Sequence, residues 1–177
     1  METSALTVEE VRIIQAMADF QMALSAFDFV SEVSPEEPIS RIERRRLRCF
    51  EDAAVVAYWR PFSDSKGLPK LSLKKLGIKA TAEQLTLHGR LKERRNKVIA
   101  HTDADRMSLA FSTFRVFENS EIMIPQYDFN DALEFYSDLD AIIIWLRTLH
   151  QAATRAIFTR VQGRQEVRFK RDHTDQG

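Results

Sequence analysis

The sequence predicts a mainly α-helical domain: an antiparallel bundle of four to five helices, with a small β-hairpin inserted before the last long helix. Glycine and proline number only five each in 177 residues, which favours long helices over a turn-rich β architecture. Hydrophobic residues make up 44% of the chain, and in several long segments they recur at helical spacing. The chain is also long enough to bury a core without disulfides or metal ions.

The first predicted helix spans residues 8–33. Thr7 and Glu10 form a capping box, in which each side chain accepts a hydrogen bond from the other residue's backbone N–H. Pro35 and Pro38 follow the helix and end it, because proline cannot continue a helix. We expect the buried face to carry the residues that recur near helical spacing: Val11, Ile14, Met17, Ala18, Met22 and Phe29.

The second predicted helix spans residues 40–60 and stops at Pro61. We expect its buried face to comprise Ile42, Cys49, Phe50, Ala53, Val56 and Ala57. Another face carries arginines at three- and four-residue steps: Arg41, Arg44, Arg45 and Arg48. Such a row either contacts RNA phosphates or, more often, forms a solvated face with pairs to acids such as Glu43 and Glu51.

Residues 61–80 are the least regular part of the chain, with turn-forming residues at 63–67. Thr81 with Gln84 is a second capping box, and it starts a third helix that runs towards Ile99. One side of this helix is expected to carry Leu85, His88, Leu91, Arg95 and Val98.

Residues 108–127 change character and predict the β-hairpin, with a polar turn at 118–121 and Pro125 at an edge position. Asn130 is placed to cap a last helix over about residues 131–161, and Gly163 is placed to stop it. Residues 1–163 therefore form a single predicted domain, and the polar residues 164–177 form a tail with a short extended piece near Val167.

Composition limits the function classes. The formal net charge is zero, so any site for nucleic acid must be a local basic patch. Cys49 is the only cysteine, which excludes an intramolecular disulfide and a multi-thiolate zinc site, and suits a reducing cytoplasm. No targeting signal and no run of about 20 apolar residues is visible, so we expect a cytoplasmic protein and no membrane partner. No metal motif or glycine-rich phosphate loop occurs, so no metal or cofactor is expected.

The informative motif is Arg95-Asn96 followed by His101, at the end of the third helix. Arginine grips a phosphate through two parallel hydrogen bonds and neutralises developing charge. Histidine titrates near neutrality and can move a proton to or from a hydroxyl. With a ribose 2′-OH as internal nucleophile, these groups can cleave RNA without a metal ion, while Asn96 orients the histidine or the phosphate.

The spacing alone carries little weight, because Arg168 and His173 in the tail share it. The motif at 95–101 differs in following a capped helix, with hydrophobic residues between its ends that would anchor it to a core. On a straight helix Arg95 and His101 are about 120° apart. They therefore meet only if the helix ends or bends between them, or if a second subunit supplies the partner.

The string from Arg95 to Asp103 resembles the signature of the HEPN superfamily, named for higher eukaryotes and prokaryotes nucleotide-binding domains. It is similar to an abortive-infection-related subgroup, in which an Arg-Asp/Asn-Lys-x-Ile-Ala-His stretch is followed by Asp. The resemblance implies an all-α bundle, usually a homodimer, with paired motifs across the interface. Many members are metal-independent ribonucleases, often toxins or antiviral effectors, whereas others are inactive or only bind nucleotides.

The resemblance implies that Arg95 holds the scissile phosphate, that His101 is the general acid or base and that Asn96 orients them. Arg94, Lys97 and Asp103 flank the motif and are expected to contact the substrate. The leading expectation is a metal-independent endoribonuclease of toxin or phage-defence type. The alternative is a non-catalytic helical dimer that binds a partner protein or a nucleotide, and a third is an antitoxin-like partner of another protein.

Structural roles compete for the same residues. His101 can simply close the helix end, where a cation interacts well with the helix dipole. Arg95 can pair with an acid of the second helix, such as Glu51 or Asp52. For His88 and His150, a satisfied core or interface position is the commoner role, and Cys49 is expected to be inert packing.

Overall fold

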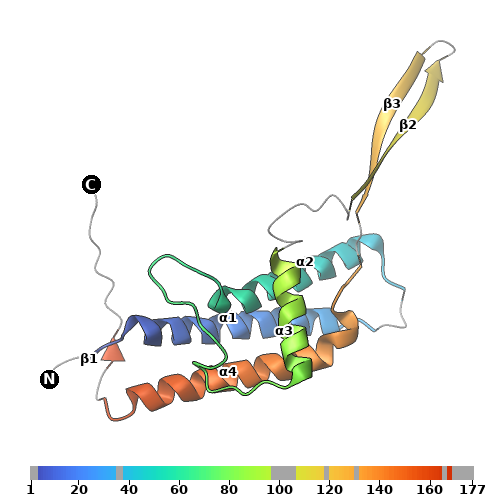
Figure 1. Ribbon diagram of the computed structural model, residues 1–177. Coiled ribbons are helices and arrows are strands. Elements are labelled where there is room, and N and C mark those ends of the chain that lie inside the picture. The colour runs from blue at the N-terminus through green and yellow to red at the C-terminus, as the bar shows by residue number, and fades with distance from the viewer. Residues whose placement is uncertain are drawn as a thin grey trace, which may run out of the picture.

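The computed structural model describes residues 4–34, 38–96, 107–117, 120–129, 132–164 and 167–168. Figure 1 shows helices packed into one body and a hairpin that projects from it. In chain order the elements are β1 (Ser4–Ala5), α1 (Val8–Ser31), α2 (Arg41–Trp59), the 3-10 turn η1 (Arg60–Phe62), α3 (Ala82–Arg94), β2 (Met107–Phe117), β3 (Ser120–Phe129), the 3-10 turn η4 (Tyr136–Asp138), α4 (Leu139–Val161) and β4 (Val167–Arg168). The predicted class, mainly α with a hairpin before the last long helix, is confirmed.

α1 is the central helix of the bundle. α2 and α4 run antiparallel to α1 and pack along it, and α3 lies across the bundle (Figure 1). The largest fully buried side chains come from every helix and from the segment before α4, and include Phe20, Phe27, Tyr58, Leu91, Phe135, Trp145 and Leu149. Burial of this apolar surface is the main force that holds the helices together.

Among the described residues, α1 is the helix whose length and hydropathy would also suit a membrane span. In this structure α1 packs between α2 and α4, and the charged side chains of Glu10 and Arg12 are buried with its apolar ones. Burial against two neighbouring helices accounts for part of the apolar composition of α1, since Ile14, Met22 and Phe29 are exposed.

The predicted starts of the first three helices are confirmed to within a residue. Thr7 and Glu10 exchange the two hydrogen bonds of the capping box at 2.8 and 3.2 Å. Thr81 and Gln84 do the same at 2.9 and 3.3 Å. Ser40 caps α2 by accepting a hydrogen bond from the backbone N–H of Glu43 at 3.1 Å. These local signals fix where each helix begins, so their positions could be read from the sequence.

The predicted buried face of α2 is largely wrong, although Ala57 is buried as predicted. Ile42 is 81% exposed and Cys49 is also exposed, so Cys49 is not buried packing. The inward side carries Leu47, Glu51, Ala54, Val55, Ala57, Tyr58 and Trp59. Hydrophobic periodicity favoured the other stripe because the true inward stripe contains a glutamate and a tyrosine, which are satisfied by partners far away in the sequence.

The predicted face of α1 is only partly right. Val11 is buried as expected, but Ile14, Met22 and Phe29 are exposed. The inward residues are those that face α2 or α4, and include Ile13, Ala16, Phe20, Ala23, Phe27 and Val30. A helix packed on two sides buries more than one narrow stripe, so a single stripe underestimates its contact surface.

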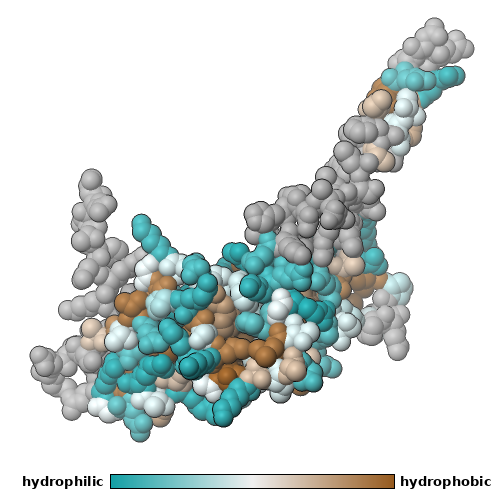
Figure 2. Space-filling view, viewed as in Figure 1, coloured by the Kyte–Doolittle hydropathy of each residue, from teal (hydrophilic) through white to brown (hydrophobic). Residues whose placement is uncertain are grey.

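β2 and β3 pair antiparallel over a longer span than predicted, from Met107 opposite Phe129 to Phe117 opposite Ser120. Phe114 pairs with Ile122, and Phe111 pairs with Pro125. The hairpin projects away from the helices, and Figure 2 shows hydrophobic residues on it as well as hydrophilic ones. A two-stranded hairpin with exposed apolar side chains is only marginally stable alone in water.

α4 begins at Leu139, later than the predicted start near residue 131. The backbone N–H groups of Glu134 and Phe135 donate to the carboxylate of Glu51 on α2, which holds this segment outside a helical path. Asn130, the predicted cap, lies outside the described residues. The predicted stop is confirmed, because α4 ends at Val161 and Gly163 has a φ of 82°, a conformation that favours glycine.

The first residues after the predicted domain boundary return to the N-terminal segment. β4 pairs parallel with β1, with Ser4 opposite Val167. The guanidinium of Arg164 donates two hydrogen bonds to the buried carboxylate of Glu10, at 2.7 and 3.2 Å. Arg164, Val167 and Arg168 therefore contribute contacts to the domain rather than standing apart from it.

Candidate functional site

The predicted motif lies where α3 ends. The inward side of α3 carries three buried residues at helical spacing: Leu87, Leu91 and Arg94. The backbone N–H of Arg95 bonds to the carbonyls of Leu91 and Lys92, and Arg95 and Asn96 then lie in a wider π-helical turn. Such turns change the angle between successive side chains and are frequent at functional sites. Arg95 and His101 can meet within one chain only if the helix ends or bends between them. The regular part of α3 ends at Arg94, just before this stretch.

Of the predicted site, the structure describes Arg94, Arg95 and Asn96. Lys97, His101 and Asp103 lie outside the described residues, so their roles remain predictions. In the tail, Arg168 belongs to the short strand β4, and His173 lies outside the described residues.

Arg94 is part of the core, which contradicts its predicted contact with substrate. Its side chain is 0% exposed, and its guanidinium lies 2.6 Å from Asp52, 3.2 Å from Glu134 and 3.9 Å from Glu51. The pairing with Glu51 or Asp52 that the sequence suggested for Arg95 therefore belongs to the preceding arginine. Arg94 takes this place because it continues the inward stripe of α3.

Glu51 ties the chain after the hairpin to α2. Its carboxylate is fully buried and accepts the backbone N–H of Glu134 at 3.0 Å and of Phe135 at 2.9 Å. Burial raises the pKa of Glu51, while these hydrogen bonds and the charge of Arg94 act in the opposite direction. From the sequence, Glu51 was expected only to pair with an arginine, either in the row on its own helix or at Arg95. The sequence signal that could have revealed its burial is its helical spacing from Leu47, Ala54 and Val55, which places Glu51 on the same side of α2.

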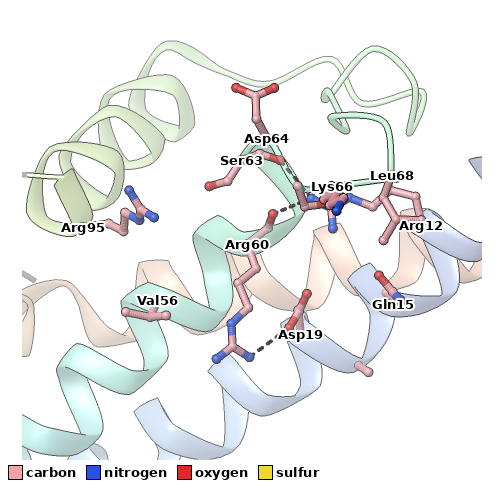
Figure 3. Close-up of a pocket in the computed structure, with 12 residues that line it drawn as sticks. Arg12, Gln15, Asp19, Val56, Arg60, Ser63, Asp64, Lys66, Leu68 and Arg95 are labelled. Atoms are coloured by element: carbon pink, nitrogen blue, oxygen red, sulfur yellow. Dashed lines mark hydrogen bonds and ion pairs between the residues drawn. The ribbon is translucent and has the colours of Figure 1, made fainter. Parts of the chain in front are cut away.

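Arg95 takes the opposite role to Arg94. Its half-buried side chain extends from α3 towards the loop after η1 (Figure 3). The guanidinium donates to Oδ1 of Asn96 at 3.1 Å, and within the described parts of the chain it has no carboxylate partner. Arg95 lines two pockets, which also share Ser63 and Asp64.

The first pocket, here called the Arg12 pocket, has a volume of about 530 Å³ and lies between α1, α2 and the loop after η1 (Figure 3). The buried Arg12 donates to the carbonyls of Arg60 and Ser63, and its Nε has no partner among the described residues. Arg60 pairs with Asp19 at 3.4 Å, and burial raises the pKa of Asp19 despite this pairing. Much of the positive charge in the Arg12 pocket is thus already engaged by protein groups.

The second pocket, here called the His88 pocket, has a volume of about 610 Å³ and lies between the loop after η1 and α3. Three cations line it against one acid, Asp64, and that acid pairs with Lys70 at 2.9 Å. The lining cations and polar donors are Lys70, Lys92, Arg95, Asn96, Ser63, Ser72 and His88. In a chain with no net charge, this local excess of positive charge and donors suits an anion such as a phosphate.

The arginine face of α2 carries ion pairs within the helix. Arg48 of this row lies 3.5 Å from Asp52, which also binds Arg94, and Arg46, which is outside the row, pairs with Glu43 at 2.6 Å. These pairs are the ones expected of a solvated helix face. The arginine row therefore offers a weaker case for RNA contact than the His88 pocket does.

Among the described residues, no group of three or more histidine, cysteine, aspartate or glutamate side chains is placed to hold a metal ion. No protein-family model matches the chain, and no curated protein or solved structure is significantly similar to it. The likeness to the HEPN superfamily thus rests on the string at residues 95–103 and on the helical architecture.

Proposed function

We propose that the protein is a metal-independent endoribonuclease in which Arg95 holds the scissile phosphate and His101 is the general acid or base. One observation carries the proposal: Arg95 lies at the shared edge of two pockets and keeps its charge free of carboxylates among the described residues. An arginine so placed can donate two hydrogen bonds to a phosphate. The neighbouring Arg94 cannot, because three acids already surround it.

The reaction needs no co-reactant. The ribose 2′-oxygen attacks the adjacent phosphorus, the bond to the 5′-oxygen breaks, and the products are a 2′,3′-cyclic phosphate and a 5′-hydroxyl. His101 takes the proton of the 2′-hydroxyl or supplies one to the leaving oxygen. Arg95 stabilises the negative charge on the phosphate in the transition state, and Asn96 fixes the Arg95 guanidinium through its hydrogen bond.

Unpaired RNA is the expected substrate, because single-stranded nucleotides can be splayed into a pocket. A reducing cytoplasm suits the exposed thiol of Cys49. A toxin or phage-defence role, with an antitoxin-like partner, belongs to the same proposal through the resemblance of residues 95–103.

Cleavage of a labelled single-stranded RNA in the presence of a chelator tests this function. Wild type should cleave, and His101→Ala and Arg95→Ala should each lose activity by at least about 100-fold. Two matched substitutions should keep full activity: His173→Ala, and Arg90→Ala, which alters a half-buried arginine of α3 that pairs with Asp138. Equal cleavage by all five proteins would contradict the proposal.

The second candidate function is a non-catalytic dimer, and the hairpin favours it. Phe114, Ile122 and Ile124 share one face of the β2–β3 ribbon and are 46–47% exposed. An isolated ribbon of two strands gains stability when a partner covers such a face. A second copy of the chain, joined through this face, would satisfy it.

Sedimentation velocity tests the second candidate. Under the second candidate, wild type is a dimer, and Phe114→Ser with Ile122→Ser shifts it to the monomer. Met123→Ser is the matched control, because Met123 pairs with Thr113 on the opposite face of the ribbon. A wild-type protein that stays monomeric at high concentration would exclude a dimer through the hairpin. If the protein forms this dimer and also cleaves RNA in a His101-dependent way, it is a dimeric ribonuclease.

A further inference from the structure

His88 links the core of the bundle to the His88 pocket. Its Nδ1 lies 2.6 Å from the hydroxyl of Tyr58, and the Tyr58 oxygen lies 2.8 Å from the indole N–H of Trp145. Tyr58 and Trp145 are fully buried, whereas His88 lines the pocket. A chain of hydrogen bonds therefore runs from α4 through α2 to the pocket wall on α3.

The hydrogen-bond chain sets the tautomer of His88. The indole N–H of Trp145 can only donate, so the Tyr58 oxygen accepts there. We assign the hydrogen of the Tyr58 hydroxyl to a bond with Nδ1 of His88, because among the described residues no other acceptor bonds to this hydroxyl. In the neutral ring the remaining hydrogen sits on Nε2. His88 is therefore an Nε2–H donor and not a base at that nitrogen.

Aromatic neighbours hold the ring in place. The ring centroids of Trp59 and Phe62 each lie 4.9 Å from that of His88, and the Phe62 contact is edge-on at 89°. Burial lowers the pKa of His88, and the charge of Lys92 lowers it further. The ring is thus fixed in orientation and favoured in its neutral form.

We propose that the His88 pocket binds the phosphate group of a nucleotide, with Nε2–H of His88 and the ammonium of Lys92 as donors beside Arg95. Lys92 lies over the Trp59 ring at 5.9 Å, which places its charge next to His88. Arg95 joins the pocket to the Arg12 pocket, so a strand whose scissile phosphate is on Arg95 would lay a neighbouring phosphate in the His88 pocket. This inference deepens the proposed ribonuclease function and rests on it for the identity of the strand as RNA. The pocket's affinity for a phosphate does not depend on cleavage.

Imidazole nitrogen NMR on the full chain, labelled with ¹⁵N-histidine, tests the inference. The signals of His88 are those that disappear in His88→Gln, and His150 on α4 serves as the internal control. Without ligand, the His88 spectrum should show hydrogen on Nε2 and none on Nδ1. Three probes are then titrated: inorganic phosphate, a uridine 3′-monophosphate, and a short thymidine DNA strand that lacks the 2′-hydroxyl and cannot be cleaved.

The nucleotide and the DNA strand should both move the His88 signals and leave those of His150 in place. Lys92→Met and His88→Gln should each weaken binding of the DNA strand by about tenfold, whereas Arg90→Ala should not. The inference would be overturned if none of the three probes moved the His88 signals, or if inorganic phosphate moved them and the nucleotide and the DNA strand did not. Probe binding at His88 without any RNA cleavage would contradict the ribonuclease proposal and support phosphate binding in the His88 pocket. RNA cleavage by a protein whose His88 signals do not move with any probe would support the ribonuclease proposal and contradict phosphate binding in the His88 pocket.

Discussion

Two adjacent arginines at the end of α3 have opposite environments. Arg94 is fully buried among Asp52, Glu134 and Glu51, and its charge is used to join α3 to α2 and to the segment before α4. Arg95 is half-buried, and its side chain lines the Arg12 pocket and the His88 pocket. One step along a helix turns a side chain by about 100°. That rotation separates a structural charge from one that is available to a ligand.

The difference follows from the cost of burying charge. A guanidinium removed from water needs compensating carboxylates and hydrogen bonds, and Arg94 has them on three sides. Arg95 keeps contact with solvent, so it needs no such partner to remain charged. The two sides of α3 should therefore respond differently to substitution: the Arg94 side in stability, the Arg95 side in phosphate binding.

The largest expected effect is on stability at Arg94. Arg94→Met should lower the free energy of unfolding by about 3 kcal/mol, because the buried Glu51 loses its nearest cation. In a chain of this size that corresponds to a drop in Tm of roughly 6–12 °C. Arg95→Met should change the free energy of unfolding by no more than about 0.5 kcal/mol. Urea unfolding of both variants measures the contrast, and equal losses would contradict it.

A smaller loss is expected at Glu51. Glu51→Gln removes the charge and turns an amide donor towards one of the two backbone N–H groups that the carboxylate now accepts. The free energy of unfolding should fall by about 1–3 kcal/mol. Amide hydrogen exchange at Phe135 should accelerate with it, because that N–H loses its acceptor. Unchanged exchange at Phe135 would show that the buried carboxylate does not hold this segment.

The smallest expected effect is a pH dependence at His88. Its pKa in the folded state lies below the ordinary value of 6.5, because burial and then Lys92 disfavour the charged ring. The unfolded chain therefore binds the proton more readily, and the free energy of unfolding falls as the pH drops below about 6.5. His88→Gln should lose less stability than wild type between pH 7.5 and pH 5. Parallel losses in the two proteins would contradict the assigned shift.

The sequence predicted the parts of this structure that depend on local signals. The capping boxes at Thr7 and Thr81 placed two helix starts, and Gly163 placed the end of α4. Alternating hydrophobic residues placed the hairpin, whose strands proved longer than expected. Each of these signals lies within a few residues of the feature that it controls.

The rotation of each helix about its axis could not be predicted in the same way. Glu51 and Tyr58 are buried because partners on other elements satisfy them: the N–H groups of Glu134 and Phe135 for the first, Trp145 and His88 for the second. These partners are distant in sequence, so the inward face of α2 was assigned to the wrong stripe. The same limit explains why Arg94 was expected to contact substrate and why the pairing with Glu51 or Asp52 was offered for Arg95.

The site depends on long-range contacts too. The loop after η1 supplies Ser63, Asp64 and Lys70 to the pocket in which His88 and Arg95 meet, and no spacing in the sequence links these residues. His88 was accordingly expected to be a satisfied core histidine. The structure shows that its Nδ1 is satisfied by Tyr58 while the residue also lines a basic pocket.

The most direct test of the central claim, that Arg95 and not the opposite side of α3 contacts phosphate, is the salt dependence of binding to the thymidine DNA strand. Each lost contact to a single strand lowers the slope of log K against log salt by about 0.7. Arg95→Ala should show that reduction, whereas Arg90→Ala, on the same helix and paired with Asp138, should keep the wild-type slope. A wild-type slope in Arg95→Ala would contradict the assignment of Arg95 as the phosphate-binding residue.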